Sequence, residues 1–282
     1  MFRSFRSGWY FALFALPCLH ADVLYTTVPQ VLPPNLPSLG YQATRTAEFG
    51  GLVQLSPGGP AVLDVAVVVM SNWALESTYE PVGTSSGFDF PFALNLYNPG
   101  PDDSVGSLIG TFTGTGFVPW RPEANTNPAP AGCGANSTRY LASDGNCYNG
   151  SLSTVTVQLG GIAVPPEFIY GFAYDTQSAG ANPLGVAGPF DSLNFAVSSQ
   201  APRVGSNPLM GIVYWNTSGA GNYADGGAGG VGVLRQDTGW GTYSGAVTFD
   251  GTPTPEPAVR LLLAACCLGL GFKLRAAHRS RK

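Results

Sequence analysis

The chain has 282 residues, of which 44% are hydrophobic and 11% charged, and its formal net charge is −4 at pH 7. All 17 Asp and Glu lie in residues 22–257, where only five arginines oppose them, so this region carries a net charge of −12. Such a surface argues against nucleic acid as a partner, because phosphate binding needs clustered Lys or Arg. It also argues against simple electrostatic attraction to an acidic polysaccharide, unless a divalent cation bridges the two.

Histidine and lysine are absent from the same region. The two His are His20 and His278, and the two Lys are Lys273 and Lys282, so all four lie close to the chain ends. A His-ligated zinc or copper site and a Lys-dependent phosphate loop are therefore excluded from residues 22–257. We expect neither a metal site nor a cofactor there, and no enzymatic activity.

The N-terminus has the layout of a secretory signal peptide. Arg3 and Arg6 precede the apolar stretch Trp9–Leu19, and Ala21 suits the last position before a cleavage site. Residues 1–21 are therefore predicted to be removed, so that the mature chain begins at Asp22, outside the cytoplasm.

The middle of the chain predicts an all-β domain. Short runs rich in Val, Phe, Tyr and Thr alternate with clusters of Gly, Pro, Asn and Asp, which is typical of strands and turns. Ala61–Met70 is too continuous for an edge strand and predicts a central one, whereas Thr154–Leu159 alternates and predicts one core-facing side. The predicted strands are Ala61–Trp73, Phe88–Tyr97, Leu108–Val118, Leu152–Leu159, Glu167–Tyr174, Ser192–Ser198, Leu209–Trp215 and Tyr243–Phe249.

Loops and a linker separate these strands. Pro29–Pro37 reads as an extended entry segment, Pro119–Cys147 and Ser218–Gly232 read as loops, and Thr252–Pro257 reads as a short linker. No repeat of fixed period and no convincing amphipathic helix is visible between the two chain ends. We therefore predict one domain over residues 22–251, an antiparallel β-sandwich of jelly-roll type.

One pair of cysteines remains for the folded region. Cys18 lies in the signal peptide, where Pro17 disfavours the alternative of a lipid-modified cysteine, and two others lie in the C-terminal apolar run. Cys133 and Cys147 flank a Gly- and Asn-containing loop, so in an oxidising compartment we expect a disulfide. In the chain-entropy model, such a cross-link stabilises the folded state by on the order of 3 kcal/mol.

Two glycine motifs match functional patterns, but the residues that those functions need are absent around them. Gly83–Gly87 matches the G-x-S-x-G nucleophile elbow, but a nucleophilic Ser needs a His or Lys base, which this region lacks. We interpret it as a turn before the strand at Phe88. Gly227–Gly232 matches G-x-G-x-x-G, but no helix follows to hold a pyrophosphate.

The third functional hypothesis is a glycosidase, because its chemistry needs only carboxylates. Two Asp or Glu on either side of a glycosidic bond suffice for that chemistry, and the candidates by residue type are Glu76, Glu80, Glu123, Glu167, Asp175 and Asp191. Calcium is a further use of carboxylates, through Asp102 and Asp103 near Asn98, or through Asp144 near Asn146. Polar turns are the favoured interpretation of both groups.

Four tryptophans bear on sugar binding. Exposed aromatic rings stack on the apolar faces of sugars. Trp120, beside Pro119, and Trp240, between two glycines, are the candidates for exposure, whereas Trp73 and Trp215 end apolar runs and are predicted to lie in the core. A carbohydrate-binding module that uses loop aromatics is therefore the second hypothesis.

The C-terminus combines a polar motif, an apolar run and a basic end. Pro255, Glu256 and Pro257 precede the apolar run, and five Lys and Arg follow from Lys273 onward. Residues 258–277 reach the ~20 residues of a transmembrane helix if the charged side chains near their ends extend to the interfaces. The basic tail then stays on the cytoplasmic side.

Residues 252–282 resemble the PEP-CTERM sorting signal of Gram-negative bacteria, which a membrane protease called exosortase recognises. The resemblance implies an inner-membrane-anchored precursor that is then moved to the cell surface or extracellular matrix. The alternative is a plain membrane anchor with a chance Pro-Glu-Pro. The stretches Leu94–Asn98 and Pro189–Asn194 also look like secreted bacterial proteins without an assigned activity. The first hypothesis is therefore a non-enzymatic surface or matrix protein, associated with the envelope or with exopolysaccharide.

Overall fold

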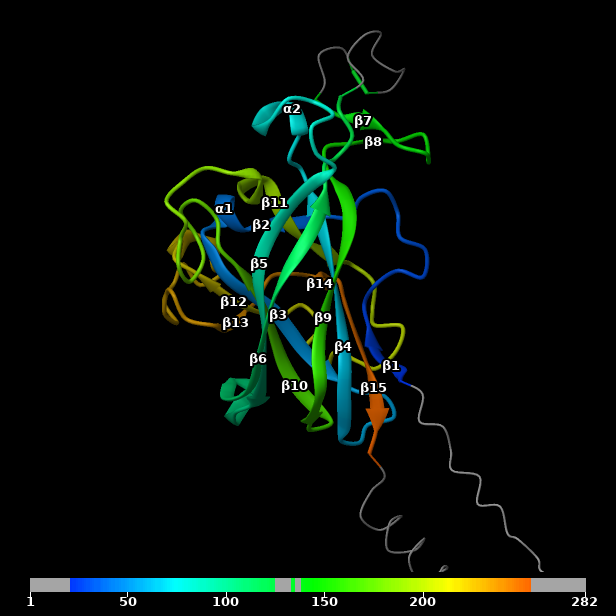
Figure 1. Cartoon of the computed structure of the whole chain (residues 1–282). Coiled ribbons are helices and arrows are strands. Elements are labelled where there is room, and N and C mark those ends of the chain that lie inside the picture. Colours follow the sequence, from blue (N-terminus) through cyan, green and yellow to red (C-terminus); the bar gives the residue numbers. More distant parts are fainter. Residues whose placement is uncertain (1–20, 125–132, 135–137, 255–282) are drawn as a thin grey trace, which may run out of the picture.

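A computed structural model describes residues 21–124, 133–134 and 138–254 (Figure 1). Almost all of the predicted signal peptide, the Pro255-Glu256-Pro257 motif and the predicted membrane segment 258–277 lie outside these residues. Within the described ranges no helix has the length and apolar character that a membrane crossing requires.

Two antiparallel sheets make up the domain. In the first sheet, β4 is central: β9 pairs along one edge, β15 and then β11 pair along the other, and β1 lies outside β15. Short strands β2 and β14 add to β11. The bounds are β1 Asp22–Thr26, β2 Ser38–Gly40, β4 Ala61–Asn72, β9 Ser151–Val164, β11 Leu193–Ser198, β14 Ser244–Gly245 and β15 Val247–Pro253.

The second sheet has the strand order β13-β12-β3-β10-β5-β6. Its bounds are β3 Thr46–Gln54, β5 Gly87–Pro99, β6 Val105–Pro119, β10 Glu167–Tyr174, β12 Val213–Thr217 and β13 Arg235–Asp237. Outside the two sheets lie a small hairpin of β7 Tyr140–Leu141 and β8 Cys147–Tyr148, and the one-turn helices α1 Tyr41–Thr44 and α2 Glu76–Tyr79. Three 3-10 turns occupy Pro101–Asp103, Pro189–Ser192 and Ala220–Asn222.

The sequence prediction of an antiparallel all-β sandwich is confirmed, and several strands are confirmed in detail. β10 has the predicted bounds, and β4 has partners along both edges, as its continuous apolar run predicted. In β9, Val155, Val157 and Leu159 are buried while the residues between them are exposed, as the alternation predicted.

Other strands differ from the prediction. The segment predicted as Leu209–Trp215 begins its strand only at Val213, because a turn at Gly211, with φ +85°, precedes it. The stretch predicted as Tyr243–Phe249 divides into β14 and β15, and β15 continues to Pro253, past the predicted start of the linker at Thr252. The prediction contains none of the strands β1, β2, β3, β7, β8 and β13.

Aromatic side chains from both sheets meet in the core. Phe195 of the first sheet lies between Phe49 and Phe172 of the second, with ring centroids 5.7 Å apart in both pairs. Phe249 of the first sheet packs edge-on against Phe168 at 5.1 Å. Alternation along each strand turns these rings inward, so the two sheets are held face to face by interleaved rings.

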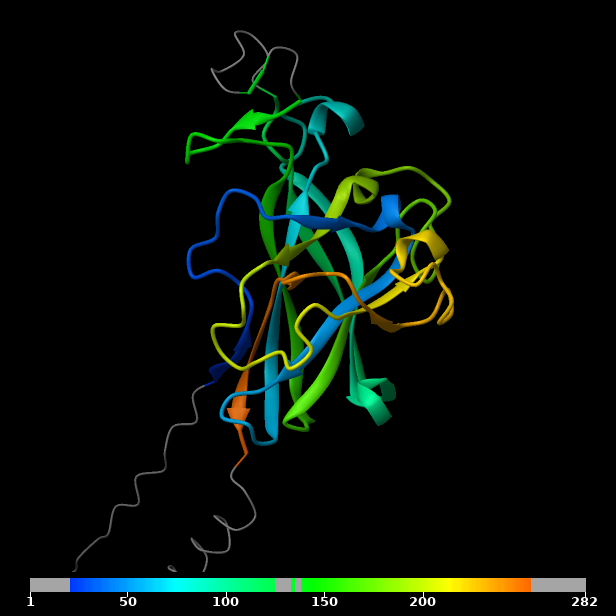
Figure 2. The ribbon, with the colours of Figure 1, turned by 180° about the vertical axis from the view of Figure 1, so that it is seen from behind.

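Different elements lie at the two ends of the sandwich. β1 and β15 pair antiparallel with Asp22 opposite Gly251, so the described chain enters and leaves at the same end. α2, β7 and β8 lie at the opposite end, as both ribbon views show (Figures 1 and 2).

We predict that Phe172→Ala lowers the free energy of unfolding by about 3–5 kcal/mol, because it removes a fully buried ring from the interleaved core. Urea denaturation of the mature protein measures the change. The matched control is Phe117→Ala on β6, where half of the ring surface is exposed, and a change below about 0.5 kcal/mol is expected. Equal losses in both variants would contradict this placement of the core.

Candidate functional site

Trp240 forms one wall of an open pocket beside β12 and β13. Its ring packs on Phe49 at 5.0 Å and on Trp215 at 5.2 Å between centroids, so the side chain is half-buried rather than free in solution. Its indole Nε1–H donates to Oδ2 of Asp237 at 2.8 Å. The ring is thereby fixed in position by packing on two sides and by one polar contact.

The pocket next to Trp240 has a volume of about 560 Å³. Tyr243, 39% exposed, and the buried Asp237 line it together with Trp240 and Asn222. Aromatic rings beside a carboxylate are the combination that sugar sites use for stacking and orientation. Sequence reasoning singled out Trp240 alone, although Asp237, Trp240 and Tyr243 follow one another closely and are separated by small residues.

Trp120 lies in a different place, next to α2. It stacks on Tyr79 with ring centroids 6.0 Å apart and contacts Phe88 at 5.1 Å, and its Nε1–H donates to the Ser85 hydroxyl at 2.8 Å. Trp120 is half-buried and shares no ring contact with Trp240. The two candidate tryptophans therefore do not form one binding face.

The other two tryptophans give one confirmation and one correction. Trp215 is 4% exposed, as predicted for the core. Trp73 is 43% exposed, so its predicted core position is wrong. It lies one residue beyond the end of β4, past the last residue that pairs with β9 and β11, and its indole N–H donates to the Ser71 hydroxyl at 3.1 Å.

Three candidate carboxylates gather at the α2 end. Glu76 Oε1 accepts the backbone N–H groups of Gly83, Thr84 and Ser85, which holds the pKa of this carboxyl below its ordinary value. The G-x-S-x-G stretch is therefore a turn whose backbone N–H groups bind a carboxylate. Glu80 accepts from the Ser85 hydroxyl at 2.8 Å, and Glu123 accepts from the backbone and hydroxyl of Ser77. Glu76 and Glu80 stabilise the turn that follows α2, whereas Glu123 links its own segment to Ser77 of α2.

The remaining carboxylate candidates are spread over other loops. Asp175 accepts from the backbone of Asn182, and Asp191 accepts from Gln177 and Gly188. Glu167 lies at the start of β10. The possible calcium ligands Asp102 and Asp103 are in the turn between β5 and β6. Across the described ranges, no three His, Cys, Asp or Glu come together as metal ligands would.

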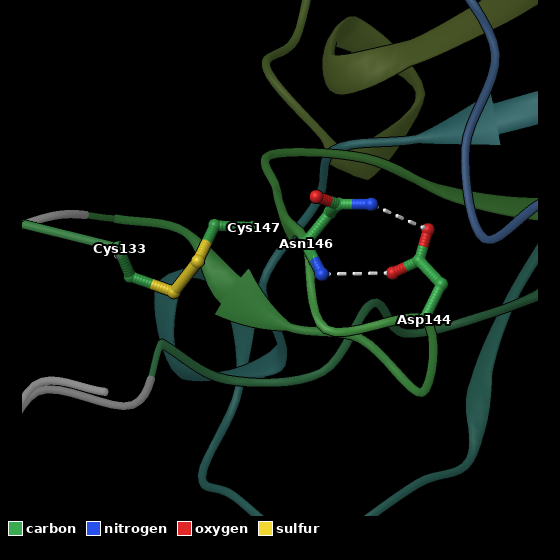
Figure 3. The surroundings of a disulfide bond; sticks show 4 residues. All are labelled: Cys133, Asp144, Asn146 and Cys147. Atoms are coloured by element: carbon green, nitrogen blue, oxygen red, sulfur yellow. Dashed lines mark hydrogen bonds between the residues drawn. A yellow bond between two sulfur atoms is a disulfide. The ribbon is translucent and has the colours of Figure 1, made fainter. Parts of the chain in front are cut away.

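The predicted disulfide between Cys133 and Cys147 is present (Figure 3). Cys147 begins β8, and the turn before it is closed by Asp144, whose carboxylate accepts the backbone and side-chain N–H groups of Asn146 at 2.9 and 3.1 Å. Tyr148 also donates to Asp144, at 2.7 Å. The carboxylate therefore serves the turn, which agrees with the favoured interpretation of this group as a polar turn.

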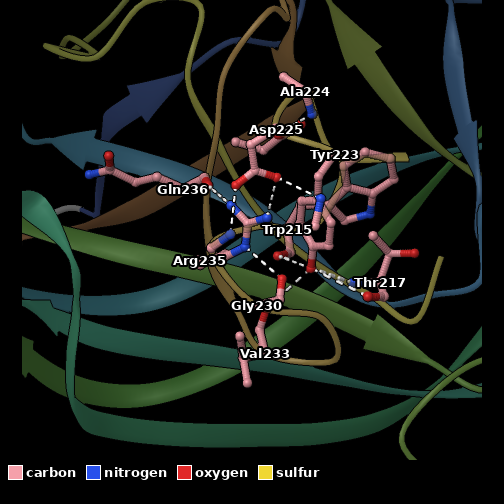
Figure 4. Close-up of polar contacts among 12 residues, drawn as sticks. Trp215, Thr217, Tyr223, Ala224, Asp225, Gly230, Val233, Arg235 and Gln236 are labelled. Carbon is pink, nitrogen blue, oxygen red and sulfur yellow. Dashed lines mark hydrogen bonds and ion pairs between the residues drawn. The ribbon is translucent and has the colours of Figure 1, made fainter. Parts of the chain in front are cut away.

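An arginine fixes the Gly-rich loop Ser218–Gly232 (Figure 4). The Arg235 guanidinium lies 3.8 Å above the centre of the Tyr223 ring, pairs with Asp225 at 2.7 Å and donates to the Gly230 carbonyl. Asp225 in turn accepts from the backbone of Gly227 and Gly229. The G-x-G-x-x-G match is thus part of a loop closed by its own ion pair.

Comparisons with protein-family models, curated proteins and solved structures found no match for this chain.

We predict that Asp225→Asn loosens the Gly-rich loop at pH 6. The Arg235 hydrogen bond and the loop N–H groups lower the pKa of Asp225 to about 2, so its contribution is present above the ordinary value of 3.8 and is lost as pH falls through 2. Hydrogen exchange at Gly227 and Gly229 should therefore be faster in the variant at pH 6. The difference in melting temperature from wild type should shrink toward pH 2. Equal melting temperatures at pH 6 would contradict the role of this ion pair.

Proposed function

We propose that this protein is a non-enzymatic exported protein that displays a disulfide-pinned β-sandwich at the cell surface or in the extracellular matrix. The observation that carries the proposal is the position of the chain ends. A membrane-bound C-terminus beyond Thr254 continues from the end of the sandwich at which β15 terminates. The opposite end, with α2 and the Cys133–Cys147 hairpin, is then the part presented outward.

Two features support a display role over an enzymatic one. Residues 22–257 contain no His or Lys, which removes the usual bases for nucleophilic catalysis. The carboxylates Glu76, Glu80 and Glu123, which lie near one another, are each engaged in structural hydrogen bonds: the first two with the turn after α2, and Glu123 with Ser77 of α2. Their hydrogen bonds give the third hypothesis, a carboxylate glycosidase, no specific support.

The strand order supports a jelly roll as the finer description of the sandwich. In chain order, the eight strands that compose it are β1, β3, β4, β5, β6, β9, β10 and β15. Numbered one to eight, they lie in the orders 1-8-3-6 and 2-7-4-5. This is the arrangement of a jelly roll, in which two Greek keys build paired sheets.

The proposed route starts with a precursor anchored in the inner membrane through residues 258–277. Exosortase then acts at the Pro255-Glu256-Pro257 motif, and the released protein becomes associated with the envelope or with exopolysaccharide. The support for this step is the resemblance of residues 252–282 to a PEP-CTERM signal.

We predict that the native host removes the chain beyond the Pro-Glu-Pro motif and that Glu256→Ala prevents this removal. Intact mass and cell fractionation measure the outcome, with Glu123→Ala as a matched carboxylate removal that should still be processed. A wild-type protein that keeps its tail in the inner membrane would overturn the sorting proposal. It would leave the plain membrane anchor.

A carbohydrate-binding module is the second candidate, favoured by the pocket that Trp240, Tyr243 and Asp237 line. If a polysaccharide binds there, it should change tryptophan fluorescence, and Tyr243→Ala should weaken binding roughly tenfold by removing the exposed ring. Trp120→Ala is the matched control at the α2 end. Binding lost only in Trp120→Ala would move the site to α2, and unchanged binding in both variants would contradict loop aromatics as the sugar platform.

A further inference from the structure

A second pocket, of about 490 Å³, lies on the outer face of the second sheet. In β3, Phe49 and Val53 point into the core, so Glu48 between Ala47 and Phe49 lies on the opposite face. Asn95 of β5 and Asn216 of β12 line the pocket beside Glu48, and Asn216 is the direct cross-strand partner of Glu48. The carboxylate therefore lies in the middle of the sheet, in a largely apolar depression to which Glu48, Asn95 and Asn216 contribute polar groups.

Two hydrogen-bond donors hold the Glu48 carboxyl over the sheet, and a glycine on the neighbouring strand leaves space for it. Asn95 Nδ2–H and the Tyr97 hydroxyl both donate to Oε1, at 2.9 and 3.0 Å. Gly171 on β10 makes room, because a Cβ there would lie 2.0 Å from the same oxygen. Among the described residues, Oε2 accepts no hydrogen bond, so one oxygen of the carboxyl remains for a ligand.

Among the residues that the structure describes, the Glu48 carboxylate has no cationic partner. Glu48 is only 8% exposed, and burial raises its pKa above the ordinary value. Arg45 is the one charged side chain that shares the pocket lining, but it is exposed at the rim and makes no ion pair with Glu48. A buried carboxylate without a counter-charge is costly, and a bound cation offsets that cost.

We propose that this pocket binds an amino sugar, with the ammonium group of the ligand seated on Glu48 and its ring hydroxyls on the surrounding polar groups. The exposed residues Ser178, Ser218 and Arg45 supply donors at the rim, and alanine methyl groups such as that of Ala173 supply apolar contact. Hydroxyl and amide groups suit a sugar ring, while the carboxylate selects a positive charge.

Net charge points to the same ligand class. Residues 22–257 carry −12, which attracts a cationic saccharide over distance and repels an anionic one. A second polar atom also lacks a partner here, because Oδ1 of Asn216 is buried without a hydrogen bond. The inference goes beyond the display function and uses none of the residues of the Trp240 pocket.

The test compares three probes that differ only at one ring substituent: glucosamine, glucose and N-acetylglucosamine. Isothermal titration calorimetry of the mature protein at pH 6 should show glucosamine binding, with the two neutral sugars at least roughly tenfold weaker, because an ion-paired hydrogen bond is lost. Added salt should weaken glucosamine binding.

Three variants locate the site. Glu48→Gln keeps the shape of the side chain and should reduce glucosamine affinity roughly tenfold or more. Ala173→Phe should block the pocket without altering Glu48. Glu167→Gln is the matched control, since it removes a carboxylate from the same sheet outside the pocket lining, and it should bind as wild type does. Circular dichroism establishes that each variant is folded.

Each other outcome overturns the proposal. Equal affinity for the three probes would show that hydroxyls rather than an ammonium group are recognised. Glucosamine binding that persists in both Glu48→Gln and Ala173→Phe, or that is lost in Tyr243→Ala, would place the site elsewhere. If glucosamine does not bind, the proposal that the pocket takes an amino sugar is wrong.

Discussion

The interleaving of aromatic rings between the two sheets is the interaction on which the rest of the structure depends. Phe195 fits between Phe49 and Phe172, and this contact sets the face-to-face position of the sheets. With Phe49 turned inward, its neighbour Glu48 must face outward, because side chains alternate along a strand. The same ring of Phe49 supports Trp240 on its other side. Core packing thereby positions a residue in each of the two pockets.

Strand β12 and the Gly-rich loop after it connect the two pockets. Trp215 on β12 lines one pocket and its neighbour Asn216 lines the other, since they point to opposite faces. The loop contributes Asn222 to the first pocket and Gly232 to the second. The ion pair of Arg235 with Asp225 closes this loop, so an interaction of modest energy helps to hold a loop that contributes residues to both pockets.

The chain ends impose a further constraint on function. Since β1 and β15 are neighbours, a tether at either terminus holds the sandwich by the same end. Strands β12 and β13 lie along the side of the sandwich, and the hairpin of β7 and β8 lies at the end opposite β1 and β15 (Figures 1 and 2). The display function that we propose would use the loops and one sheet face of a sandwich tethered at this end.

The fold class followed from sequence because it depends on local patterns. The continuous run of β4, the alternation of β9 and the spacing of Cys133 and Cys147 each carry their meaning within a short stretch. Strand β3 was missed because Glu48, Gly50 and Gly51 interrupt its apolar pattern. Those same residues matter in the folded protein: Gly50 lies under the backbone of Tyr170, where a Cβ would be 1.7 Å from its carbonyl oxygen.

The sequence by itself determined the all-β class, the acidic character of residues 22–257, the absence of His and Lys there, and the paired cysteines. Only the tertiary structure decided which polar residues meet. Glu48, Asn95 and Asn216 come from three strands far apart in the chain, and cross-strand register alone brings them to one face. The contrast between exposed Trp73 and buried Trp215 has the same origin. Burial depends on what the opposite sheet covers, and a single strand carries no information about its partner across the core.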